Sequence, residues 1–156
     1  MTWPELLHYS NQPLGPVTSR EQLHGESKPD GLWCSVGIEW EEWCRQEEFQ
    51  LDHLKHVHVV TLREDANLRH ISGSAELDRF SAQYRLTISE LFPACYTAHF
   101  GLIDWVRVAA DYGGIVIAPY CWERRFTSHT HWYHGWDCAS ACIWDARQIE
   151  AVRLID

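Results

Sequence analysis

The sequence has no long apolar run. No segment of the 156 residues approaches the ~20 consecutive apolar residues that span a bilayer, so we expect no transmembrane helix. The opening MTWPELLHYS lacks a basic region followed by an apolar stretch, and we expect no signal peptide. These absences favour a cytoplasmic protein, in which cysteines remain reduced thiols. The cysteines stand at positions 34, 44, 95, 121, 138 and 142.

The sequence also lacks an excess of basic residues. Asp and Glu number 22 against 13 Lys and Arg, which gives a formal net charge of -9. A broad phosphate-binding surface needs clustered Lys and Arg, so the charge argues against it. A protein or small-molecule acceptor is therefore a better expectation than a nucleic acid.

Several short motifs are missing as well. The sequence contains no C-x-x-C pair, no G-x-S-x-G, no Gly-rich phosphate loop and no dinucleotide-binding fingerprint. A thiol nucleophile with a histidine base stays possible, although a free cysteine is more often a small buried hydrophobe.

Five potential zinc ligands do cluster near the C-terminal end of the sequence, although none of their spacings matches a standard zinc site. They are His129, His131, His134, Cys138 and Cys142. The alternative is a loop with surface histidines followed by buried thiols on one strand. We expect no metal, and a His/Cys metal-binding protein remains one alternative reading.

What is present suits a globular fold. Hydrophobic residues make up 46% of the chain and nine are tryptophans, enough for one domain over residues 1–156. Hydrophobic periodicity predicts helices over 39–49, 75–84 (with Ser74 as cap) and 102–112. It predicts strands over 3–9, 31–37, 56–63, 67–71, 115–120, 139–144 and 151–155, with a long loop over 11–30. Strands scattered among two or three helices predict an α+β fold with a mixed or split sheet.

Four short segments follow one another in a distinctive order. They are LLHYS at the end of the first strand, GLWCS in the second, YGGIVI after a helix, and CIWDARQI near the end. This order resembles the compact ADP-ribosyltransferase fold, including its small toxin-like members, over nearly the whole chain. Each segment is short and degenerate, and the ordered set carries the resemblance.

The resemblance implies that the protein uses NAD+ as a substrate. In the family the first-strand histidine binds the adenosine ribose, which implies His8, flanked by Tyr9 and Ser10. Groups of the second strand hold the nicotinamide amide, which implies Gly31, Leu32 and Ser35. An aromatic ring stacks on the nicotinamide, and Trp33, Tyr9 and Tyr112 are the available rings.

The sequence departs from the family where a carboxylate is expected on the late strand. Ser140 occupies that position, and Asp137, three residues earlier, is the best replacement as the group that stabilises developing positive charge. The residues also allow plainer roles: His8 as a core histidine, Ser35 as a strand hydroxyl, Asp137 as a cap or an arginine partner. The leading hypothesis is an NAD+-dependent ADP-ribosyltransferase of unknown target. The rival is a non-enzymatic interaction module on the same fold, associated with a toxin, phage or defence system.

Overall fold

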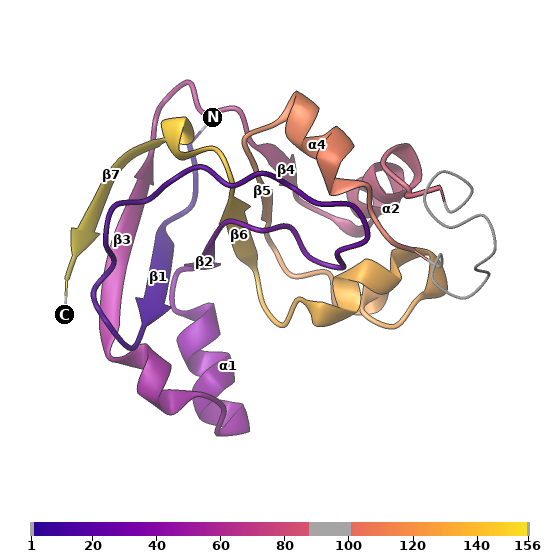
Figure 1. The fold of residues 1–156 in the computed structure, drawn as a ribbon. Coiled ribbons are helices and arrows are strands. Elements are labelled where there is room, and N and C mark those ends of the chain that lie inside the picture. The colour runs from indigo at the N-terminus through magenta and orange to yellow at the C-terminus, as the bar shows by residue number, and fades with distance from the viewer. Residues whose placement is uncertain (1, 88–100, 156) are drawn as a thin grey trace.

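Seven strands of the computed structural model form one mixed sheet in the order β4-β5-β6-β2-β1-β3-β7 (Figure 1). The structure describes residues 2–87 and 101–155, so Cys95 lies outside the described residues. The strands are β1 (Leu6–Ser10), β2 (Leu32–Val36), β3 (His56–Leu62), β4 (Arg69–Ile71), β5 (Gly114–Ile117), β6 (Ser140–Ile143) and β7 (Ile149–Leu154). The helices are α1 (Glu39–Glu47), α2 (Ser74–Gln83) and α4 (Trp105–Asp111), with 3-10 turns η1 (Leu51–Leu54), η2 (Trp122–Arg124), η3 (Ser128–Gly135) and η4 (Ala146–Gln148).

Strand pairing makes the sheet mixed. β4 and β5 run parallel, and every other neighbouring pair is antiparallel. This confirms the predicted α+β class with a mixed sheet.

The larger core lies between one face of β4–β5–β6 and the elements α2, α4 and η3. Phe80 of α2, Trp105 of α4 and Trp132 of η3 are almost fully buried there, with ring centroids 5.6–6.0 Å apart. Figure 1 shows α2 and α4 beside β4 and β5, at one end of the sheet. Burying these rings removes several hundred square ångströms of apolar surface from water, which makes this core the main source of stability.

The opposite face of the sheet carries a second core. Leu6, Val60, Val116 and Ile143 are buried and pack together although they come from four different strands. In β5 both the odd and the even residues are buried, because each face of this strand is covered. A strand covered on both faces has an uninterrupted apolar sequence, as GIVI does.

Some sequence predictions need correction. Ser74 does not cap α2: it is the first helical residue, the cap position is Gly73, and the Ser74 hydroxyl bonds Glu123 instead. The buried residues of α4 are Trp105 and Val108. The helix begins three residues later than the sequence predicts, because the Asp104 side chain accepts a hydrogen bond from the Arg107 N–H and caps it.

Residues 11–31 connect β1 to β2 as an irregular segment that we call the strap. Figure 1 shows it crossing the sheet toward α4 and returning to β2. Its backbone is fastened at several points: Leu14 N–H donates to His58 Nε2 (3.2 Å), and Arg20 N–H donates to the Trp144 carbonyl (2.8 Å). These hydrogen bonds fix the path of the strap over the sheet. The strap contains the loop that the sequence predicts over 11–30.

None of the helices in the described ranges combines the length and the apolarity that crossing a membrane demands.

Candidate functional site

The two central strands of the sheet separate after a short ladder. β1 and β2 pair only at Leu6–Val36 and Leu7–Ser35, whereas β1 pairs with β3 at five positions. Beyond Leu7 the backbone of β1 no longer meets β2. The separation splits the sheet locally, between strands that are otherwise neighbours.

The His8 side chain contacts the β2 backbone just beyond the end of the β1–β2 ladder. Its Nδ1 lies 2.7 Å from the carbonyl oxygen of Trp33. Because a carbonyl only accepts, Nδ1 is the donor, and Nε2 of the neutral ring remains an acceptor. Burial lowers the pKa of His8, the bond to Trp33 opposes that shift, and nearby His58 adds to it. His8 is thus held neutral at the point where the strands part.

A cleft of about 370 Å³ opens at this separation. Residues from β1, β2 and β6, and from the segments beside them, form its walls. They are Leu7, His8, Tyr9, Ser10, Lys28, Trp33, Cys34, Ser35, Trp40, Gln50, His53, Gly135, Trp136, Asp137 and Ser140. The volume is within the usual range for a small-molecule site.

Most of the residues implied by the family resemblance line this cleft. His8, Tyr9 and Ser10 come from β1, and Trp33 and Ser35 from β2. Ser140 is the first residue of β6, and Asp137 lies three residues before it. They are up to 132 positions apart in the sequence. The sheet brings them together because β1 and β6 both flank β2.

Aromatic rings and one cation dominate one wall. The rings of Trp33 and Trp136 meet edge to face with centroids 4.8 Å apart, and Lys28 Nζ lies 5.3 Å from the centre of the Trp33 ring. Lys28 is exposed and forms no ion pair with any described residue. Its ammonium is available to an anionic group of a ligand. Trp33 is partly exposed and offers ring surface for a planar group, whereas Trp136 is almost fully buried.

Asp137 supplies the carboxylate of the cleft. Its Oδ1 accepts a hydrogen bond from Arg125 Nη2 at 2.9 Å, and both side chains are mostly buried. Arg125 also donates to the Tyr120 hydroxyl (3.1 Å), which in turn donates to the Trp136 carbonyl. Within the described residues Asp137 Oδ2 has no hydrogen-bond partner. The carboxylate is therefore oriented by Arg125 and keeps one oxygen for another contact.

The two serines of the cleft already have local partners. The Ser35 Oγ accepts a hydrogen bond from Trp40 N–H (2.9 Å), which satisfies a free donor at the start of α1. The Ser140 hydroxyl donates to the Cys138 carbonyl (2.9 Å). Ser35 is buried and its role is structural, whereas Ser140 is partly exposed to the cleft.

Tyr9 adds a neutral phenol to the cleft. Burial, and to a smaller extent Glu41 and Glu5, raise the pKa of Tyr9 to about 12. The hydroxyl stays protonated at physiological pH and is able to donate a hydrogen bond.

Three implied residues lie elsewhere. Gly31 packs against β6, where a Cβ would come within 2.5 Å of the Ile143 carbonyl oxygen, so its glycine is required by close backbone approach. Leu32 pairs with Ile143 and packs on the second core. Tyr112 lines a different cleft, which removes it from the rings able to stack beside Trp33.

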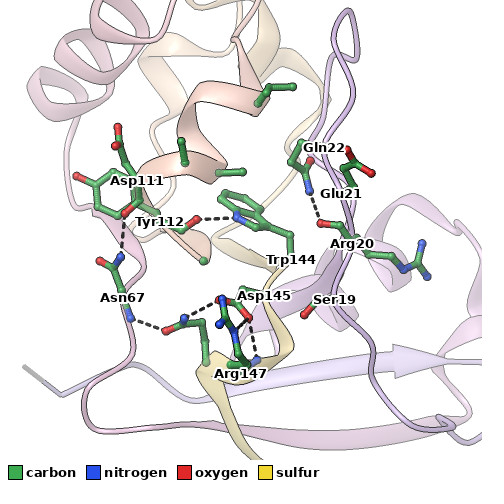
Figure 2. A pocket seen from close by; sticks show the side chains of 15 residues that line it. Ser19, Arg20, Glu21, Gln22, Asn67, Asp111, Tyr112, Trp144, Asp145 and Arg147 are labelled. Carbon is green, nitrogen blue, oxygen red and sulfur yellow. Dashed lines mark hydrogen bonds and ion pairs between the residues drawn. The ribbon is translucent and has the colours of Figure 1, made fainter.

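The cleft around Tyr112 is larger, about 770 Å³, and lies between the strap, α4 and η4 (Figure 2). Its polar groups bond to one another: Trp144 Nε1 donates to the Tyr112 carbonyl (2.7 Å), and Asn67 N–H donates to Gln148 Oε1 (2.6 Å). Asp145 accepts from Arg147 and Gln148. Because these donors and acceptors are already paired, we place the candidate site in the smaller cleft.

The structure gives the cysteines in its described ranges no chemical role. The described cysteines are free and buried, and burial raises the pKa of Cys34 to about 12 and that of Cys138 to about 11. A neutral buried thiol is a poor nucleophile. Cys34 borders the cleft, yet it is a packing residue.

The cluster of zinc ligands seen in the sequence is dispersed. His129 Nε2 lies 3.1 Å from Asp78, His131 stacks on His134, and Cys142 is buried in the large core. Across the described ranges no group of three or more His, Cys, Asp or Glu residues is placed to hold a metal ion.

Sequence reasoning missed four polar or aromatic residues that the fold adds to the cleft, namely Lys28, Trp40, Gln50 and His53. Lys28 lies in the strap, which has no periodic pattern, and Trp40 reads as one of several apolar residues of a helix. Gln50 is in the left-handed region (φ 46°), which is rare for a residue with a side chain and costs on the order of 1 kcal/mol. No local pattern in the sequence signals these contributions.

No family model, no curated protein and no solved structure matches this chain.

Proposed function

We propose that the cleft between β1 and β2 binds NAD+ and that the protein is an ADP-ribosyltransferase-like transferase acting on an unidentified acceptor. The observation that carries the proposal is the local split of the sheet. It gathers His8, Trp33 and Asp137 in one cleft. His8 and Trp33 lie in two of the segments that resemble the family, and Asp137 precedes the last of these segments by five residues.

The composition of the cleft suits this ligand. NAD+ carries two planar rings, a diphosphate and two riboses. Trp33, which packs on the buried Trp136, offers surface for a ring. Lys28 offers a cation for a phosphate, and His8 Nε2 offers an acceptor for a ribose hydroxyl. Each group meets a chemically matching part of the ligand.

Transfer chemistry rests on Asp137. Cleavage of the bond between ribose and nicotinamide passes through an oxocarbenium-like state, as glycoside hydrolysis does. A carboxylate beside that ribose stabilises the developing positive charge. Arg125 orients Asp137 through Oδ1 and leaves Oδ2 available, so the ion pair is compatible with this role.

A second candidate is a binding module that holds the ligand without cleaving it. Ser140 stands where a family carboxylate is expected, and its hydroxyl is bonded to Cys138. Asp137 shares its charge with Arg125, which reduces the field that it exerts on a ligand. Binding without turnover would leave the ligand contacts intact.

Thermal melting with NAD+ tests the shared part of both candidates. At 100 times its dissociation constant, a ligand that binds only the folded state adds ~2.7 kcal/mol to the free energy of unfolding. For a chain of this length that corresponds to a rise in Tm of roughly 5–10 °C. Trp33→Leu should abolish the rise, whereas the control Trp122→Leu should keep it, because Trp122 is 66% exposed and outside the cleft.

Nicotinamide release then separates the two candidates. Release that depends on Asp137 supports a transferase, and a Tm rise without release supports the binding module. An unchanged Tm at millimolar NAD+ would remove both.

A further inference from the structure

One end of the cleft is built by α1 and η1, which the family resemblance does not reach. Trp40 of α1 lines the cleft there, together with Gln50 and His53. The Trp40 ring stacks on Trp43 with centroids 5.1 Å apart and an angle of 12° between the planes. The Phe49 ring meets both indoles nearly at right angles. The position of Trp40 is thus set by an aromatic cluster of its own.

Gln50 lies at the same end. Its backbone is left-handed (φ 46°, ψ 43°), as is that of Glu48 (φ 54°), and the two flank Phe49. These two turns carry the chain from α1 into η1 and place Gln50 beside the cleft. The Gln50 side chain is exposed, and its amide forms no hydrogen bond with any described residue. A donor and an acceptor are therefore free in the cleft that Trp40 also lines.

An indole ring and a free carboxamide that line the same cleft are a match for adenine. The flat base stacks on the ring, which is a common and strong contact for nucleobases. A glutamine amide pairs with adenine through two hydrogen bonds, accepting from N6 and donating to N7. Hypoxanthine and guanine present two acceptors at the corresponding edge, so the same amide loses one bond with them.

We propose that Trp40 and Gln50 form an adenine subsite, with Trp40 stacking on the base and Gln50 reading its edge. The cleft then takes a ligand with two rings, one against Trp33 and the other against Trp40. This inference rests on the proposed function for the identity of the dinucleotide. The adenine contact itself can be measured with AMP, which carries no nicotinamide.

Calorimetric titration tests the subsite. NAD+, nicotinamide hypoxanthine dinucleotide and AMP are titrated into the unsubstituted protein and into Trp40→Leu and Gln50→Met. Trp122→Leu and Gln46→Met are the matched controls, because both positions are exposed and neither lines the cleft. Melting curves establish that each variant is folded. If Trp40→Leu does not fold, Gln50→Met carries the test, because the Gln50 side chain is exposed.

The unsubstituted protein should bind NAD+ at least tenfold more tightly than the hypoxanthine analogue. Gln50→Met should bind the two dinucleotides equally. Trp40→Leu should weaken NAD+ and AMP by about tenfold or more, and the two controls should change neither. Binding of NAD+ that is unaffected by Trp40→Leu and Gln50→Met overturns the subsite and leaves the proposed function standing. AMP binding that depends on Trp40, without any NAD+ binding, supports the subsite and overturns the proposed function. Absence of binding for all three ligands overturns both.

Discussion

The ring of His8 donates a hydrogen bond from Nδ1 to the carbonyl oxygen of Trp33 at 2.7 Å, in the place where β1 and β2 stop pairing. A side chain thus satisfies a backbone acceptor that the strand ladder no longer reaches. The same contact fixes the ring so that Nε2 is its remaining acceptor. His8 therefore has a structural role, and the proposed function adds a ligand-binding role. Experiments can separate the two roles.

The structural use predicts a pH dependence of stability. The pKa of His8 in the folded protein is lowered, chiefly by burial, below the ordinary value of 6.5. Between the two pKa values the unfolded chain binds more protons than the folded one, so acid favours unfolding. The contribution of neutral His8 to the free energy of unfolding is complete above pH ~6.5, and it is lost as the pH falls through the pKa of His8 in the folded protein. Urea unfolding between pH 5 and 8 measures it.

The matched variant for that measurement is His8→Asn, whose amide can still donate to Trp33 but does not titrate. Its free energy of unfolding should fall less steeply below pH 6.5 than that of the unsubstituted protein. The other histidines contribute equally to both curves. Parallel curves for the two proteins would exclude His8 as a source of the pH dependence.

Asp137→Asn is expected to remove charge while keeping shape. If Asp137 stabilises the ribose charge as the bond breaks, nicotinamide release should fall by ~10²–10³, the usual cost of one such electrostatic contact. Affinity for NAD+ should change much less, because that charge develops only during reaction. The asparagine oxygen still accepts from Arg125, so Tm should change little. Full activity in Asp137→Asn with a normal Tm would take Asp137 out of the reaction.

The reverse pattern is expected for His8→Ala, which removes a binding group and not the carboxylate. Affinity for NAD+ should weaken while turnover at saturation is largely retained. The two variants together distinguish ground-state contacts from transition-state contacts.

Gly31→Ala should destabilise the fold. The added Cβ would lie 2.5 Å from the Ile143 carbonyl oxygen and 2.9 Å from Cys142 Sγ, and β6 cannot withdraw without breaking its ladder with β2. Forced overpacking of this kind costs ~1–3 kcal/mol. Gly15→Ala is the control, because nothing lies within 4 Å of its Cβ position. That change should leave stability unchanged or raise it by ~0.4–1 kcal/mol. Equal melting temperatures for the two variants would contradict the close approach.

We also predict that the purified protein carries no stoichiometric zinc and that a chelator leaves its Tm unchanged. Among the described residues the histidines of positions 129–134 contact Asp78 or one another, and Cys142 is buried in the core. Elemental analysis gives the answer directly. One equivalent of zinc, lost together with stability on chelation, would favour the metal-binding alternative.

Periodicity in the sequence was sufficient for most of the secondary structure. HVHVVTL and GIVI are rich in β-branched residues and form β3 and β5. EWEEWCRQE forms α1, with its charged residues on the solvent side. Helix starts were less predictable. Ser74 is a suitable cap residue, but the cap position is taken by Gly73, whose backbone is extended. The Ser74 hydroxyl instead donates a hydrogen bond to Glu123, 49 positions away.

For the candidate site, too, the sequence predicted some features and the tertiary structure decided the others. The sequence by itself placed His8 near the end of the first strand, Trp33 within the second and Asp137 just before a late strand, because hydrophobic alternation and turn residues are local signals. It could not show that Tyr112 faces another cleft, that Arg125 pairs with Asp137, or that Lys28, Trp40 and Gln50 border the site. Those facts depend on strand order and on where β1 and β2 separate. Tertiary structure decided them, because contacts between residues over 100 positions apart are set by packing of the whole sheet and leave no periodic trace in the chain.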